Sequence, residues 1–236
     1  MATCTLLSLT IALAATPLTE SAATIGDQRV GLDADLMALS SSTVAASPTL
    51  RLGSATLRIG VAEQAELMVR PPGVNAAVLT GGSVWSGPAA ARLKVTALKS
   101  EDGAWGLAAM PYVIVPLSIG TIPAVGLAMP VSMPLPAGLA LSVMPAVQID
   151  SNGAPTLPLT AAVSWPVFSA VTAYGEVGVA ATPLALAGTR WLGTSGVSVA
   201  LHPAIALDAG VSAQSADLSF AGGFEGTGFV GVSLRM

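Results

Sequence analysis

The chain is poor in charged residues, aromatic residues and cysteine. Only 9% of its 236 residues are Asp, Glu, Lys or Arg, against about 25% in soluble proteins. The few basic residues are scattered, which argues against the basic patch that nucleic acid requires. The single cysteine, Cys4, excludes a disulfide framework. With 53% hydrophobic residues and a mean hydropathy of +0.74, much of the surface should face something other than water.

Long uninterrupted helical spans are also missing. No charged residue occurs between Trp105 and Val147, a length that would allow two transmembrane helices. Prolines nevertheless recur through this stretch, at Pro111, Pro116, Pro123, Pro130, Pro134, Pro136 and Pro145. Each costs a helix interior about 3 kcal/mol, which argues against the alternative of a helical bundle. The other backbone arrangement that satisfies its polar groups in lipid is a closed β-barrel.

The stretch from Val125 to Asp150 has the period of a β-hairpin. Large apolar residues stand at every second position, with Gly, Ala, Pro, Ser and other small or polar residues between them. The segment Leu135–Gly138, with Pro136 and Gly138, separates the two halves and has turn chemistry. The pattern predicts two antiparallel strands with one apolar face.

Similar alternation recurs along the chain and predicts roughly twelve strands of ~10 residues, the even number expected of an outer-membrane barrel. Short connections, such as Ala62–Gln64 and His202–Ala204, alternate with mostly longer ones, such as 71–90. The predicted fold class is therefore all-β: a transmembrane antiparallel up-and-down β-barrel. A soluble β-sandwich would also alternate, but its outward positions would be charged. Candidates for a weak aromatic girdle are Trp85, Trp105, Tyr112, Trp165, Phe168, Tyr174 and Trp191.

The first residues have the features of an export signal. A short apolar core, Leu6–Ala15, precedes two small-residue cleavage sites, Leu13–Ala15 and Ser21–Ala23. No Lys or Arg occurs before Arg29, so the usual basic start is missing, and a buried first helix is the alternative. We expect residues 1–23 to be a signal peptide and residues 24–236 to form the barrel.

Eight charged residues fall on the face opposite the apolar one. A Lys or Arg facing lipid at the midplane costs about 2–4 kcal/mol, so this face should line the lumen. The lumen-facing candidates are Arg58, Glu66, Arg70, Arg92, Lys94, Glu176, Asp208 and Arg235. They either pair with one another and plug the interior or line a narrow pore, since about twelve strands lie between filled barrels and open channels.

Several segments are similar to a known family. Residues 54–70 (SATLRIGVAEQAELMVR), residues 91–97 with 111–150, and the C-terminal GTGFVGVSLRM resemble the meta-pathway phenol-degradation family of outer-membrane transporters. The resemblance implies a barrel that takes up small, hydrophobic or aromatic compounds. It also implies that an outer-membrane assembly machinery reads the last strand, Gly226–Met236. That family usually ends in an aromatic residue, whereas this chain ends in Met236.

Motifs for catalysis or cofactor binding are weak. Gly226–Gly231 matches G-x-G-x-x-G, but a dinucleotide site needs a helix and an acidic residue after it, and the sequence ends at Met236. His202 is the single histidine, and no G-x-S-x-G elbow accompanies it. We expect no enzyme activity, no cofactor and no metal site.

The sequence therefore predicts a passive channel for small solutes, embedded in outer-membrane lipid and without a nucleic-acid partner. A structural or adhesive barrel with a plugged lumen is the first alternative. A secreted soluble β-sandwich is the second.

Overall fold

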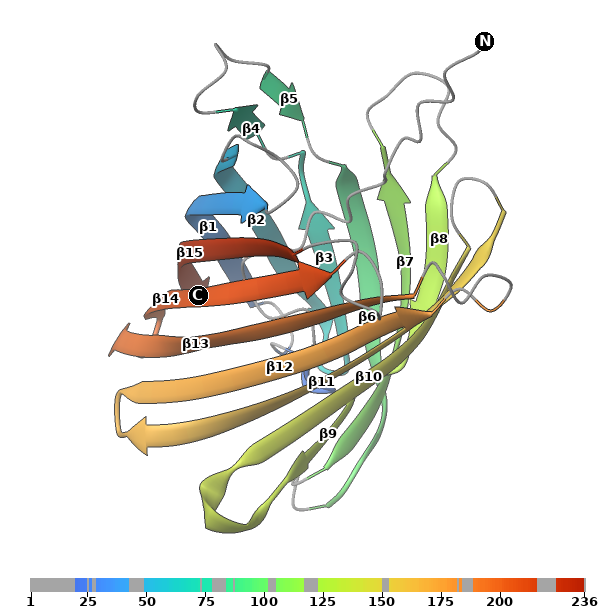
Figure 1. Cartoon of the computed structure of the whole chain (residues 1–236). Helices are drawn as coiled ribbons and strands as arrows, with labels where there is room; N and C mark the ends of the chain where they lie inside the picture. The colour runs from blue at the N-terminus through green and yellow to red at the C-terminus, as the bar shows by residue number, and fades with distance from the viewer. Residues whose placement is uncertain are drawn as a thin grey trace, which may run out of the picture.

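The computed structural model of the chain is a single antiparallel sheet that curls around on itself (Figure 1). It describes residues 20–24, 26, 29–42, 49–72, 74–77, 84–86, 88–101, 105–116, 123–149, 153–181, 183, 189–215 and 224–235, with side chains outside 35–54, 74–86 and 224–225. Among these residues, no helix is long and apolar enough to cross a membrane.

The sheet has fifteen strand segments. The first nine are β1 (Val30–Ser42), β2 (Thr49–Ala62), β3 (Ala65–Arg70), β4 (Val74–Ala77), β5 (Val84–Ser86), β6 (Ala89–Lys99), β7 (Gly106–Val115), β8 (Ala124–Ala128) and β9 (Val131–Pro134). The others are β10 (Ala140–Ile149), β11 (Pro155–Phe168), β12 (Val171–Ala181), β13 (Arg190–His202), β14 (Ile205–Ser215) and β15 (Phe224–Arg235).

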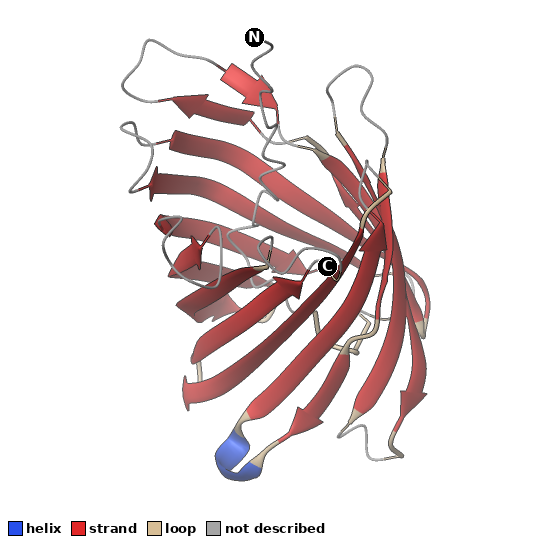
Figure 2. Cartoon of the chain, turned by 45° about the vertical axis from the view of Figure 1, so that its right-hand side comes forward, coloured by secondary structure: helices blue, strands red, loops and turns tan. Residues whose placement is uncertain are grey.

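Three of the barrel strands are built from two segments each. β3 and β4 both pair with β2, and β8 and β9 both pair with β10. β5 pairs with β4 while β6 pairs with β3, so β5 and β6 occupy one strand position. Joining these pairs leaves twelve strands, which confirms the predicted strand number. Each short predicted turn connects two paired neighbours, including the 3-10 turn Pro136–Gly138 at one end of the barrel (Figure 2).

Closure comes from the first and last strands. β1 pairs with β2 on one side and with β15 on the other, in a ladder that runs from Gly31–Arg235 to Ser42–Glu225. The predicted final strand is thus confirmed as the closing strand. A two-layered β-sandwich, the alternative fold, is not what these strands form.

The alternating pattern sorts residues between the two sides of the wall. Apolar residues of the predicted lipid phase are exposed, for example Leu127 at 41%, Val147 at 42% and Val177 at 65%. Their neighbours in the chain, such as Ala128, Gln148 and Glu176, are buried. The outer surface is therefore an apolar belt, and the core of the molecule is the interior of the barrel.

Two interruptions of the ladder lie beside prolines. Pro130 separates β8 from β9, and Met129 donates its backbone N–H to the carbonyl of Pro145 across the break. The pairing of β10 with β11 stops at Pro145–Leu159 and resumes at Gln148–Thr156, which leaves Pro158 in the gap. Each proline lacks a backbone donor, so its cost is lowest at such interruptions.

Candidate functional site in the barrel lumen

The sheet register places four of the predicted lumen charges on three adjacent strands. Glu66 of β3 is directly opposite Lys94 of β6, and Met68 is opposite both Arg58 of β2 and Arg92 of β6. Glu66 and Lys94 are 0% and 1% exposed, whereas Leu93 and Val95 beside Lys94 are 40% and 38% exposed. These charged side chains therefore point into the barrel.

The buried charges are paired. Arg58 Nη1 donates to Glu66 Oε1 at 2.9 Å, Arg58 Nε donates to Asp33 Oδ2, and Lys94 Nζ lies 3.3 Å from Glu66 Oε2. Burying an ion costs several kcal/mol unless partners and hydrogen bonds compensate it. The pairing explains how the charges of Glu66 and Lys94 are accommodated although both side chains are almost fully buried.

Residues 20–24 enter this interior as a separate segment. Thr24 Oγ1 donates to the carbonyl of Glu63 in the turn between β2 and β3. Ala22 is 2% exposed; its N–H donates to Ser132 Oγ at 2.9 Å, and its carbonyl accepts from Thr96 Oγ1 at 2.9 Å. Ser132 Oγ also lies 3.1 Å from Ser142 Oγ of the neighbouring strand. The segment is thus fixed to the turn between β2 and β3 and to the inner wall at β6 and β9.

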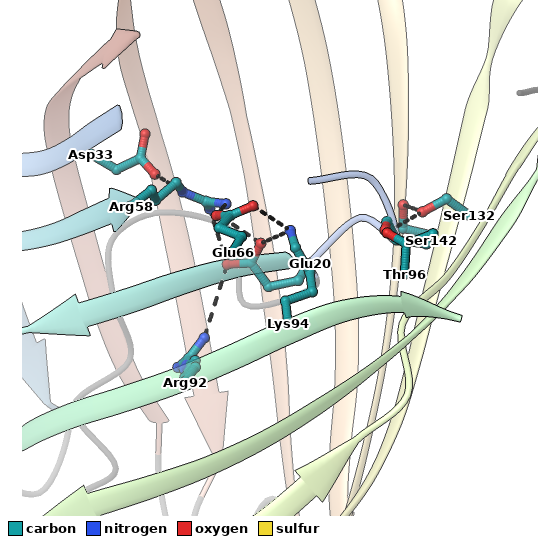
Figure 3. Close-up of polar contacts among 10 residues, drawn as sticks. Glu20, Asp33, Arg58, Glu66, Arg92, Lys94, Thr96, Ser132 and Ser142 are labelled. Carbon is teal, nitrogen blue, oxygen red and sulfur yellow. Dashed lines mark hydrogen bonds and ion pairs between the residues drawn. The ribbon is translucent and has the colours of Figure 1, made fainter. Parts of the chain in front are cut away.

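Glu20 places a carboxylate among the three lumen cations (Figure 3). Arg58 Nη2 is 3.1 Å from both carboxylate oxygens, Lys94 Nζ is 3.7 Å from Oε2, and Arg92 Nη1 is 3.9 Å from Oε1. Burial opposes ionisation of this carboxyl, but the charges of Arg58, Lys94 and Arg92 outweigh it and hold the pKa of Glu20 below its usual range.

We call these six residues the lumen charge cluster: Glu20, Asp33, Arg58, Glu66, Arg92 and Lys94. Its three cations and three carboxylates balance in formal charge. Two of the carboxylates, Asp33 and Glu66, belong to the wall, while the third comes from the segment that enters the lumen. Without Glu20, the wall residues would present a net positive site that suits an anion.

An apolar cluster adjoins the charges. Met68, Met110 and Met144 are 1%, 2% and 9% exposed and pack with Ala128, against Tyr112 and Ala146. Tyr112 is opposite Arg92 in the ladder and donates its hydroxyl to Gln148 Oε1 at 3.2 Å. The inner wall therefore offers cations and flexible thioether side chains next to one another.

The other four predicted lumen charges lie outside the lumen charge cluster. Arg70 Nε donates to Thr56 Oγ1 at 3.1 Å, and Asp208 Oδ2 accepts from Ser233 Oγ at 3.1 Å. Glu176 is 2% exposed on β12. In the order of strands around the barrel, β12 is far from β3 and β6. Arg235, at the end of β15, is exposed.

Sequence reasoning missed two members of the cluster and misplaced two aromatic residues. Glu20 falls inside the predicted signal peptide, which places it outside the predicted barrel, whereas Asp33 stands in the polar phase of its strand, and that phase is the signal for its inward position. Of the girdle candidates, Trp105, Trp165 and Phe168 are exposed at 45%, 52% and 71%, while Trp191 is half-buried. Tyr112 and Tyr174 are on the inner face instead, and the Trp85 side chain lies outside the described residues.

In the described part of the chain, no group of three or more His, Cys, Asp or Glu residues could hold a metal ion. The chemistry available in the lumen charge cluster is charge pairing and hydrogen bonding. A solute anion could replace the Glu20 carboxylate there without any covalent step.

Comparison with known proteins identifies the fold. No protein-family model and no curated protein sequence matches the chain. Among solved structures, the COG4313 outer membrane channel from Pseudomonas putida F1 superposes with a TM-score of 0.61 at 11% identity, over 89% of this chain and 96% of that one. This chain shares its barrel fold with outer-membrane channels.

Two porins give the same result. The NanC porin has a TM-score of 0.58 at 10% identity and covers 87% of this chain and 100% of its own. The KdgM porin has a TM-score of 0.57 at 8% identity, and the match covers 86% of this chain and 98% of the porin chain. At these identities the similarity concerns the fold, and it agrees with the twelve-stranded closed ladder described above.

Proposed function

We propose that the protein is an outer-membrane β-barrel that lets small solutes cross passively through its lumen. The observation that carries the proposal is the division of the closed wall into two faces. The outer face is an apolar belt, whereas the inner face carries the lumen charge cluster and many small polar residues. In lipid, every backbone polar group must be satisfied within the protein, and a closed ladder does this.

The finer assignment to a transporter of hydrophobic or aromatic compounds rests on the family resemblance. Met68, which is opposite Arg92 in the ladder, packs with Met110 and Met144. These methionines support a solute with an apolar part, because thioether side chains adapt to irregular apolar shapes. An enzymatic role has no support from the residue pattern. His202, the single histidine, stands at the end of β13, and its Nδ1 accepts the backbone N–H of Ala204 in the following turn.

Conductance tests the proposal. The mature protein is reconstituted into planar bilayers, and we expect steady single-channel openings. Ser212→Arg, on the inner face of β14, adds a cation to the lumen and should shift the reversal potential in a KCl gradient toward that of chloride. Ala209→Ser, on the exposed face of the same strand, is the matched control and should leave it unchanged.

A structural barrel with a plugged lumen is the second candidate, and one observation favours it. The segment at residues 20–24 is bonded to Glu63, Thr96 and Ser132, and so it occupies part of the interior. Absence of openings in the wild type and in a variant lacking Glu20, with both folded, would favour this candidate over the channel.

We further propose that the assembly machinery of the outer membrane recognises Gly226–Met236. Deleting this segment removes most of β15 and unpairs both β14 and β1. Heat-modifiable barrel should then disappear from the outer-membrane fraction, and Met236→Asp should reduce its amount. Met236→Phe should assemble at least as well as the wild type, and a deletion variant that still inserts would contradict the proposal.

A further inference from the structure

The three lumen cations converge on one carboxylate that is not part of the barrel wall. Arg58, Arg92 and Lys94 come from β2 and β6, and each lies within 3.9 Å of the Glu20 carboxylate. Lys94 is 1% exposed and has only Glu20 and Glu66 as ion-pair partners among the described residues. The cations are therefore held in place by the wall, while the carboxylate comes from an entering segment.

We propose that Arg58, Arg92 and Lys94 form a binding site for small monocarboxylates, which the mature chain fills with its own Glu20 until a solute displaces it. The inference rests on the proposed channel function, since it concerns a solute that reaches the lumen. Arginine guanidinium groups suit carboxylates because they offer several donors in a fixed plane. The Glu20 side chain stands for the carboxylate and methylene groups of such a solute.

The surroundings specify an apolar group next to the carboxylate. Met68 is opposite both Arg58 and Arg92 in the ladder, and Met110 packs beside it. A polyanion would meet the wall carboxylates Asp33 and Glu66, which already accept from Arg58. One negative charge restores the formal charge balance that Glu20 provides, so a monocarboxylate fits better than a dicarboxylate.

The same contacts bear on export. If the signal were removed after Ala23, the mature chain would lack Glu20 and Ala22, whose bonds fix the segment to the wall. Cleavage after Ala15, the earlier small-residue site, retains them. Intact mass of the protein purified from outer membranes should therefore correspond to a chain that starts at Thr16. A mature chain that starts at Thr24 would overturn the inference.

Competition between Glu20 and a free carboxylate gives the main test. A tethered group acts at an effective concentration on the order of millimolar, so wild-type protein should bind butanoate weakly. Glu20→Gln keeps the shape of the side chain and removes its charge. Calorimetry of the folded protein in detergent should show butanoate binding to Glu20→Gln at least tenfold tighter than to the wild type.

Three controls separate this site from general effects. Butanamide, which has the same size without the charge, should bind to neither protein. Glu101→Gln, in the exposed turn after β6, should behave as the wild type. Adding Arg92→Gln to Glu20→Gln should weaken butanoate binding at least tenfold, and Arg92 is exposed enough, at 24%, for the double variant to fold; heat modifiability on gels checks that it does.

The outcomes are distinguishable from those of the conductance test. Equal butanoate affinity of the wild type and Glu20→Gln, or equal binding of butanamide, would overturn the carboxylate site even if the barrel conducts ions. Tight, charge-dependent binding in detergent together with silent bilayers would instead overturn the channel and leave the site standing.

Discussion

The two halves of the barrel wall are built differently on the inside. Strands β1, β2, β3, β6, β7 and β10 present the buried methionines and every member of the lumen charge cluster except Glu20. Three of the strands in this half of the sheet, β3–β4, β5–β6 and β8–β9, are each made of two segments. Strands β11–β15 are each a single segment, and the inner positions near the middle of β13 and β14 include Thr194, Gly196, Ser198, Gly210 and Ser212. The paired charges thus lie in the half whose strands are made of two segments, which we call the irregular half, and the half with continuous strands is called the regular half.

The regular half fills its interior by a different device. Tyr174, Gly196, Gly210 and Phe229 are consecutive partners across β12–β15. A Cβ added to Gly196 would lie 2.5 Å from Tyr174 Oη, and one added to Gly210 would lie 2.6 Å from Phe229 Cζ. Both rings therefore lie flat over glycines of a neighbouring strand. In this half, packing against backbone replaces the ion pairing of the other half.

The largest effect is expected from breaking the ion pairs of the irregular half. Lys94→Met removes the cation opposite Glu66, which is 0% exposed. Removing one partner of a buried pair typically costs 3–5 kcal/mol, because the other charge stays buried. We expect the free energy of unfolding, measured by urea titration in lipid vesicles with tryptophan fluorescence, to fall by about that amount.

A double variant checks the cause of that loss. Lys94→Met combined with Glu66→Gln removes both charges, and it should recover part of the stability lost in the single variant. A double variant that is as unstable as Lys94→Met alone would show that packing, and not the unpaired carboxylate, accounts for the loss. The halves would then differ less than their side chains indicate.

The sequence predicted the barrel because a period of two recurs in most of its strands. Val177, Leu127 and Val147 could be assigned to lipid from alternation alone, since a slip of one residue would reverse the faces. The same phase placed Arg58, Glu66, Arg92 and Lys94 on one face. Alternation carries no information about distance across the lumen, so it could not predict which of these charges meet.

The contact of Glu20 with the wall is one that no local pattern reveals, whereas the inward position of two tyrosines follows from strand phase. Glu20 lies before the first strand and reaches Arg58 over 38 positions in the sequence. Tyr112 and Tyr174 carry the residue type expected at a membrane interface, but each is in the inward phase of its strand and covers a glycine. Strand phase was the better guide for these two tyrosines than residue type.

A second comparison tests whether the regular half has room on its inner side. Val211 is 60% exposed near the middle of β14, and the next residue, Ser212, faces inward. Val211→Arg faces lipid and should cost about 2–4 kcal/mol, whereas Ser212→Arg should be close to neutral in the same urea titration. Equal losses would mean that the faces of β14 are wrongly assigned.

The matching substitution in the irregular half sharpens this result. Ser142 faces inward on β10, and its Oγ lies 3.1 Å from Ser132 Oγ. Ser132 Oγ in turn accepts the backbone N–H of Ala22. We therefore expect Ser142→Arg to reduce stability more than Ser212→Arg, because the arginine displaces the segment at residues 20–24.

The smallest effect is expected from filling one of the covered glycines. A Cβ at Gly210 would lie 2.5 Å from the Ser195 carbonyl oxygen and 2.6 Å from Phe229 Cζ, so Gly210→Ala forces the strand and the ring apart. Overpacking of this kind typically costs 1–3 kcal/mol. Gly228, on the neighbouring strand, has no atom within 4 Å of an added Cβ, which makes Gly228→Ala the matched control. Urea titration should separate the two variants, since both make the same chemical change and only Gly210 is covered by a ring. If Gly210→Ala is as stable as Gly228→Ala, the Phe229 ring moves aside freely, and the regular half is packed more loosely than the tyrosine and phenylalanine positions indicate.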